Sequence, residues 1–144
     1  MTEVNTIQEA YNLMKPFRVV IAGTRTFSNY ELLKIECDAA LKNRLPNVVV
    51  ISGGNRRYDK DGALQPSADL LGEQYAIERE LECRIIPAKW KSQGKPAGPG
   101  RNAIMAGMAD AAIVFQIGES SGSASMISES NKAGIPVKII KIKS

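Results

Sequence analysis

Histidine is absent from this 144-residue chain, and several other residue types that support common chemistries are scarce. Without histidine, the chain alone cannot assemble a Ser-His-Asp triad. Two cysteines, Cys37 and Cys83, are too few for a closed zinc site, so we expect both to be reduced core residues and expect neither a metal nor a cofactor. No apolar run approaches the roughly 20 residues needed to cross a bilayer, and the N-terminus lacks the apolar region of a signal peptide. The composition therefore predicts a cytoplasmic protein with no membrane partner.

Aromatic residues make up only 6% of the chain, which offers few platforms for stacking nucleic-acid bases. The single tryptophan, Trp90, is interpreted as core or loop cover rather than as such a platform. The formal net charge of +4 suits an anionic ligand but equally suits a solvated basic surface. Nucleic acid is therefore allowed as a partner without being required.

Five short runs rich in β-branched residues are present. They are continuous rather than alternating, which is typical of parallel strands covered on both faces. They lie at residues 18–22, 48–52, 83–87, 111–115 and 137–142. The helix-like stretches between them, at 29–43, 68–80, 101–108 and 124–133, predict a single α/β domain, Rossmann-like and doubly wound, with a mainly parallel five-stranded sheet. We expect the strand order 3-2-1-4-5, with helices on both faces.

Helix start and stop signals agree with this division. The sequence from Ser28 to Glu31 fits a capping box, Ser67 is the expected cap of the helix at 68–80, and Gly134 followed by Pro136 ends the helix at 124–133. A further helix at 6–14 carries an apolar stripe. We therefore expect residues 1–16 to form a segment that packs on the domain or on a partner subunit, and residues 17–144 to form the binding domain.

The segment from Gly118 to Gly122 matches the G-x-S-x-G pattern of a hydrolase nucleophile elbow. Because the base that would activate Ser120 is missing, we interpret this loop as a phosphate cradle and the match as coincidence. Similar glycine-containing loops follow the first two strands, at 22–28 and 52–57. Ligands of open α/β sheets bind where such loops leave the carboxyl ends of the strands.

Backbone N–H groups at a helix N-terminus, serine hydroxyls and Arg25 would suit a phosphate in this crevice. Arg101 is a further candidate, because a cation at the expected start of a helix breaks a local rule; the alternative is a solvated arginine or one paired with Glu119 or Asp110. The long polar loop at 55–66 is an insertion that could reshape or cover the pocket.

The segments AGTRTF, SGG, SADLLGEQYA, PAKW, GKPAGPGRNAIM, ADAAIVF and GESSGSASMISESNKAGIPV occur in an order that resembles the YspA-like branch of the SLOG superfamily. This superfamily also contains the LOG phosphoribohydrolases and the Rossmann-like domain of the DNA-processing protein DprA. The resemblance spans residues 18–142 and implies a domain that binds a nucleotide or nucleotide-derived signal, often in bacterial conflict systems or phages.

The residues that match the motifs of the family are implied to contact this ligand. Together with the candidates from the loops, the predicted ligand-binding set is Gly23, Thr24, Arg25, Gly53, Gly54, Asp69, Arg101, Asn102, Gly118, Ser120, Ser121, Gly122 and Ser123. In the LOG enzymes a catalytic Glu lies three residues after the motif Thr, whereas here Met126 lies three residues after Ser123. This departure argues against LOG-type phosphoribohydrolase activity.

Three functions follow as alternatives. The first is a sensor or sequestering protein for a phosphate-bearing nucleotide, expected to be a homo-oligomer. The second is a hydrolase of an N-glycosidic bond, for which Glu119 and Asp69 are the candidate catalytic residues. The third and least favoured is DprA-like binding of single-stranded DNA. Its candidate contacts are Arg56, Arg57, Lys60, Lys89, Lys91 and Lys95.

Overall fold

The computed structural model describes residues 6, 7, 10 and 14–143. Its centre is a sheet of five strands in the order β5-β2-β1-β6-β7. These strands are β1 (Phe17–Gly23), β2 (Val48–Ser52), β5 (Glu82–Ile85), β6 (Ala111–Ile117) and β7 (Val137–Ile142). All four pairings are parallel, so the predicted order 3-2-1-4-5 is confirmed once the five strands are counted along the chain.

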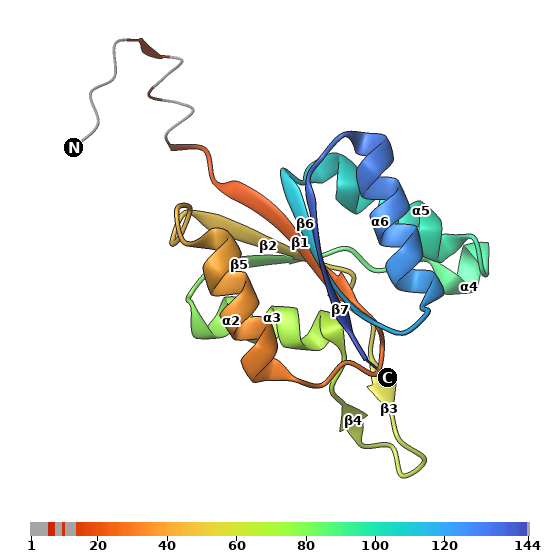
Figure 1. The fold of residues 1–144 in the computed structure, drawn as a ribbon. Helices are drawn as coiled ribbons and strands as arrows, with labels where there is room; N and C mark the ends of the chain where they lie inside the picture. Colours follow the sequence, from red (N-terminus) through yellow and green to blue (C-terminus); the bar gives the residue numbers. More distant parts are fainter. Residues whose placement is uncertain (1–5, 8–9, 11–13, 144) are drawn as a thin grey trace.

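Helices cover both faces of the sheet (Figure 1). The helices α2 (Tyr30–Leu41) and α3 (Ala68–Glu78) lie on one face, and α5 (Ala97–Met108) and α6 (Ser121–Ala133) lie on the other. The short helix α4 (Trp90–Gln93) precedes α5. Within the described residues, no helix is both long enough and apolar enough to cross a membrane.

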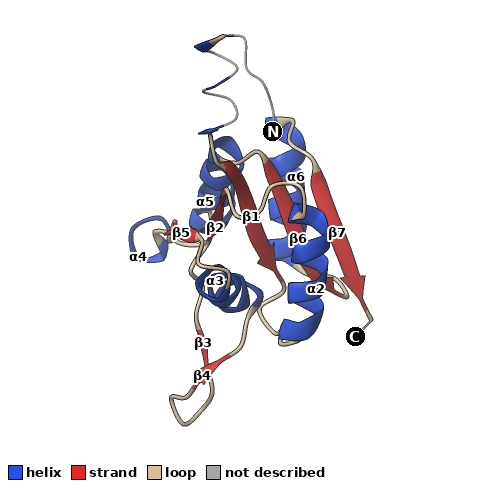
Figure 2. Cartoon of the chain, turned by 90° about the vertical axis from the view of Figure 1, so that its left-hand side faces the viewer, coloured by secondary structure: helices blue, strands red, loops and turns tan. Residues whose placement is uncertain are grey.

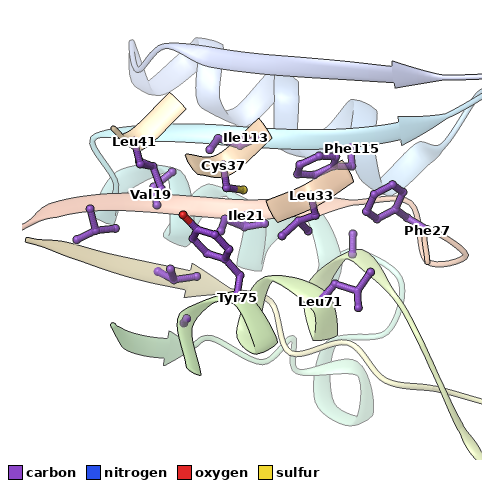
Figure 3. Packing of buried hydrophobic residues seen from close by; sticks show 14 residues of the cluster. Val19, Ile21, Phe27, Leu33, Cys37, Leu41, Leu71, Tyr75, Ile113 and Phe115 are labelled. Carbon is purple, nitrogen blue, oxygen red and sulfur yellow. The ribbon is translucent and has the colours of Figure 1, made fainter. Parts of the chain in front are cut away.

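The β-branched runs of the three central strands, β1, β2 and β6, are buried between two helical layers, whereas the edge strands β5 and β7 are partly exposed. β2 is buried along its whole length, and Val19, Val20 and Ile21 of β1 have no exposed surface. On the α2–α3 face the core includes Leu33, Cys37 and Tyr75 (Figure 3). On the other face, Met105 of α5 and Met126 of α6 pack on the sheet.

The helix ends follow the capping signals with one exception. Ser67 accepts a hydrogen bond from the N–H of Leu70, and Gly134 ends α6 in the left-handed conformation, as predicted. The expected capping box beginning at Ser28 is wrong. Asn29 is the N-cap of α2, and its Oδ1 accepts from the N–H of Leu32 at 3.0 Å.

The helix expected at 101–108 begins four residues earlier, at Ala97. The segment before Arg101 reads as a loop because it contains Pro96, Pro99 and two glycines. Pro99 is nevertheless compatible with the first helical turn, because the N–H groups of that turn have no intrahelical acceptor. Arg101 therefore lies in the second turn of α5 rather than at its start.

The insertion at 55–66 contains a small antiparallel hairpin, β3 (Arg57–Tyr58) and β4 (Leu64–Gln65), that was not predicted. Figure 2 shows it projecting away from the main sheet. Asp59 organises its turn by accepting from the N–H groups of Asp61 and Ala63. The helix expected at 6–14 lies mostly outside the described residues.

Candidate functional site

A cavity of about 750 Å³ lies at the carboxyl ends of β1 and β6, where the sequence predicts the crevice. The loops after β1 and β6 meet there with the first turns of α3, α5 and α6, so the positive ends of three helix dipoles point toward one space. Its lining consists of Ala22, Gly23, Thr24, Arg25, Asn55, Asp69, Trp90, Lys95, Gly98, Pro99, Arg101, Asn102, Met105, Glu119, Ser120, Ser121, Gly122, Ser125 and Met126.

Thr24 joins the loops that follow β1 and β6. Its backbone N–H donates to the carbonyl of Phe115 at 2.9 Å, and its Oγ1 accepts from the N–H of Ile117 at 3.0 Å. A Cβ at Gly23 would collide with the Phe115 carbonyl oxygen, so glycine permits this close approach. Two walls of the cavity are thereby held in fixed positions.

The first turn of α6 presents unused hydrogen-bond donors to the cavity. Ser120 caps this helix by accepting from the N–H of Ser123 at 3.3 Å. Within the described part of the chain, the N–H groups of Ser121 and Gly122 have no protein acceptor, and both residues line the cavity. Donors of this kind at the positive end of a helix favour an anion.

Arg101 and Asp69 form the buried floor of the cavity, with exposed fractions of 7% and 6%. The Arg101 guanidinium donates to the carbonyl of Gly53 at 2.6 Å, to that of Ile86 at 3.3 Å and to Asn102 Oδ1 at 2.9 Å. Asp69 Oδ2 accepts from the N–H of Asn55 at 3.0 Å. A Cβ at Gly53 would collide with the Arg101 guanidinium and lie 3.0 Å from Asp69 Oδ2, so both groups crowd around this glycine.

Burial changes the acidity of both groups. It raises the pKa of Asp69 above its usual value, and the N–H of Asn55 and the charge of Arg101 oppose that rise. Burial also lowers the pKa of Arg101, whereas Asp69 acts in the opposite direction. The nearby charge thus makes burial less costly for each side chain.

Two further contacts fix the surroundings of the floor. Asn102 Nδ2 donates to Ser125 Oγ at 3.1 Å and so links α5 to α6. On the other side, Arg56 forms a two-pronged pair with Glu73, at 2.6 and 3.1 Å, and Glu73 also accepts from Ser52 Oγ at 2.7 Å.

The structure brings together most of the residues that the sequence predicts for the site. Gly23, Thr24, Arg25, Asp69, Arg101, Asn102, Ser120, Ser121 and Gly122 line the cavity, as does the candidate catalytic residue Glu119. Four predicted residues do not line it: Gly53, Gly54, Gly118 and Ser123.

These four residues support the walls instead. Gly53 accepts from Arg101, and the N–H of Gly54 donates to Ser52 Oγ. Gly118 lies in a turn with φ of 53°, and buried Ser123 places its hydroxyl 3.4 Å from that of Thr24.

Sequence reasoning missed Trp90, Lys95, Asn55 and Ser125 as lining residues. Of the two interpretations of Trp90, core or loop cover, the first is wrong, because the residue is 50% exposed. The signal available was its place in the irregular segment between β5 and α5, whose loop leaves the same edge of the sheet. Among residues 55–66, only Asn55 lines the cavity, so the hairpin does not cover it.

No protein-family model matches the sequence. The Gene 61 protein of Mycobacterium phage D29 is 34% identical over 122 residues, which cover 83% of this chain and 93% of the phage protein. The chain belongs to the family of this phage protein.

Among solved structures, the fold is similar to that of DNA processing protein A from Helicobacter pylori, with a TM-score of 0.60 and 19% identity. The match covers 88% of this chain but 66% of the other, so the chain spans less than two thirds of that protein. The H. pylori structure concerns a single-stranded DNA binding mode. The corresponding protein of Streptococcus pneumoniae matches with a TM-score of 0.47 and 16% identity, over 89% of this chain and 59% of the other. The likeness to the H. pylori protein shows the fold, which is Rossmann-like.

Proposed function

We propose that this protein binds a nucleotide or nucleotide-derived signalling ligand by its phosphate, as a sensor or sequestering protein. The observation that carries the proposal is the pair of unused N–H donors at Ser121 and Gly122, facing the same cavity as Arg25. Orphaned donors at a helix N-terminus bind phosphate readily. In the described residues, the exposed Arg25 side chain has no hydrogen-bond or ion-pair partner and is available to supply a counter-charge.

The cavity also offers groups for the uncharged part of such a ligand. Its volume of about 750 Å³ lies within the range of about 300–1,000 Å³ that small-molecule sites occupy. Asp69 at the floor supplies a carboxyl group of the kind that accepts hydrogen bonds from ribose hydroxyls in other Rossmann-like folds. A phosphate at the rim and a sugar toward the floor would use both sets of groups.

The order of the motifs supports assignment to the YspA-like branch, and the phage source of the relative accords with the sequestering form of the proposal. We further propose, as the sequence predicts, that the protein is cytoplasmic and forms a homo-oligomer.

Hydrolysis of an N-glycosidic bond is less well supported. Met126, at the position of the LOG glutamate, is 1% exposed and lines the cavity, so an apolar side chain stands where that mechanism requires a carboxylate. Glu119 is exposed on the rim of the same cavity and is the alternative catalytic candidate together with Asp69. A Glu119→Gln variant that keeps any observed turnover would remove Glu119 from this role.

Single-stranded DNA is the other candidate partner, since the H. pylori protein of similar fold binds it. Two of the six basic residues considered for this role are engaged elsewhere: Arg56 pairs with Glu73, and Arg57 donates to the carbonyls of Arg25 and Pro66. A salt-dependent shift of a labelled single strand would support this alternative, and its absence at low salt would remove it.

The proposed function is tested by ligand retention. The purified protein is incubated with a pool of nucleotides, cyclic nucleotides and ADP-ribose, separated from free ligand, denatured and analysed by mass spectrometry. We expect one intact compound to be retained, and we expect its loss in Arg25→Met. Arg84→Met serves as the matched control, because Arg84 is exposed on β5, pairs with Glu82 and does not line the cavity. Retention of nothing would contradict the proposal, and release of a free base with ribose phosphate would establish the hydrolase.

A further inference from the structure

Trp90 is an exposed aromatic side chain at the mouth of the cavity. It is the only tryptophan of the chain, it belongs to the short helix α4, and half of its surface is accessible. A tryptophan used for packing buries most of its surface, because the gain in free energy scales with the apolar area removed from water. The exposure of Trp90 at a cavity therefore calls for an explanation other than packing.

The indole ring packs against the start of α5. A Cβ at Gly98, in the first turn of α5, would lie 2.8 Å from Cη2 of Trp90, so the ring rests directly against this glycine. Within the described residues, no aromatic ring stacks on Trp90, no cation lies over it, and its indole N–H donates no hydrogen bond to the protein. The ring thus has a backbone support and accessible surface that lines the cavity.

The rest of the lining combines charged and polar residues with apolar ones, among them Pro99, Met105 and Met126. The donors of Ser121 and Gly122 and the charge of Arg25 suit an anionic group, whereas Trp90 offers a flat apolar surface. A nucleotide combines these two chemistries, because its phosphate is anionic and its base is planar and stacks on aromatic rings.

We propose that Trp90 is the stacking platform for the base of the ligand and therefore the residue that distinguishes nucleotides from base-free sugar phosphates. This inference rests on the proposed function, in which the phosphate binds at the N-terminus of α6. Because residue 98 is glycine, the ring lies close to α5 and is already restricted in its motion. It therefore loses less conformational entropy when a base stacks on it.

The experiment uses binding calorimetry on the full chain with five probes that carry a base, AMP, GMP, CMP, UMP and ADP-ribose, and with ribose 5-phosphate as the base-free probe. Trp90→Ala should weaken the best-bound base-carrying probe by about 5- to 150-fold, the effect expected when one stacking platform is lost. Trp90→Phe, which keeps a ring, should restore most of the affinity. The affinity for ribose 5-phosphate should be the same in all three proteins.

Tyr58→Ala is the matched control, because Tyr58 is an exposed aromatic residue on β3 that does not line the cavity. It should bind every probe as the wild type does. Since Trp90 is the only tryptophan, the intrinsic fluorescence of the wild type should also change on addition of the base-carrying probe and not on addition of ribose 5-phosphate.

The outcomes separate this inference from the proposed function. A base-carrying probe that binds wild type and Trp90→Ala equally well overturns the role of Trp90 and leaves phosphate binding intact. Equal affinity of the wild type for ribose 5-phosphate and for the base-carrying probes also overturns the role of Trp90 and leaves phosphate binding intact. Failure of every probe to bind overturns both proposals.

Discussion

Replacing Arg101 by Met tests the account of the cavity floor. The substitution keeps an unbranched apolar side chain but removes the guanidinium, which leaves the carbonyl oxygens of Gly53 and Ile86 and the Oδ1 of Asn102 without this donor. Two of the three bonds are shorter than 3 Å, at 2.6 and 2.9 Å, and a hydrogen bond to a charged group contributes about 1.5–3 kcal/mol.

The variant no longer bears the cost of burying the guanidinium charge, which offsets part of this loss. In the other direction, buried Asp69 loses its neighbouring positive charge, which destabilises the variant further. A buried acceptor left without its donor typically costs about 1–3 kcal/mol, so for three acceptors and a partial offset we expect the free energy of unfolding of Arg101→Met to fall by about 3–5 kcal/mol. With a urea dependence of about 2 kcal/mol per molar, the midpoint of unfolding should fall by about 1.5–2.5 M.

The loss should depend on pH with a defined sign. Burial already holds the pKa of Asp69 above its usual value, and Arg101 opposes this, so the variant should raise that pKa further. A carboxyl whose pKa is raised on folding contributes its full stability below the unfolded pKa, about 3.9, and loses that contribution as the pH rises through the folded pKa. The difference between variant and wild type should therefore be larger at pH 8 than at pH 5.

Urea unfolding followed by circular dichroism at both pH values measures this effect. Arg25→Met is the control, because its exposed side chain has no hydrogen-bond or ion-pair partner among the described residues, and it should change the free energy of unfolding by no more than about 0.5 kcal/mol. A loss of less than about 1 kcal/mol in Arg101→Met, or a loss that grows as the pH falls, would refute the reasoning.

Two further predictions concern binding and thiol reactivity. Arg25→Met should weaken binding of the retained nucleotide by about 10-fold or more, the effect of one lost charge-assisted hydrogen bond, whereas Arg84→Met should bind it as the wild type does. Calorimetry measures both affinities. Equal affinities of Arg25→Met and the wild type would exclude Arg25 from the site. Burial raises the pKa of Cys37 to about 12, so this thiol should not react with Ellman's reagent in the native protein at pH 8 and should react in urea. Mass spectrometry identifies which cysteine has been labelled. Rapid labelling of Cys37 in the native protein would contradict its burial.

The sheet could be predicted because its signal is local and strong. Each run of β-branched residues is continuous, and such runs are typical of strands in a parallel sheet with both faces covered, as in β2. The carboxyl edge followed from topology, because every parallel strand of a doubly wound sheet ends there. Gly23, Asp69 and Ser120 therefore lie at one cavity although they are far apart in the sequence.

The parts that were missed depend on tertiary context. The hairpin β3–β4 has strands of two residues each, too short to leave a periodic pattern. The first turn of α5 contains Gly98 and Pro99, which read as loop residues although Pro is tolerated at this place. The supporting role of Gly53 could not be recognised before Arg101 was seen to donate to its carbonyl across the cavity floor.

The most direct test of the central claim is a ¹⁵N–¹H correlation spectrum of the full chain titrated with the retained nucleotide. The account predicts that the amide signals of Ser121 and Gly122 shift most, because their unused N–H groups gain a phosphate acceptor. The signals of Gly23 to Arg25 should shift as well, because these residues line the same cavity. The signals of the hairpin residues Arg57 to Gln65 should remain in place. Shifts confined to surfaces away from the cavity, with Ser121 and Gly122 unchanged, would contradict the account.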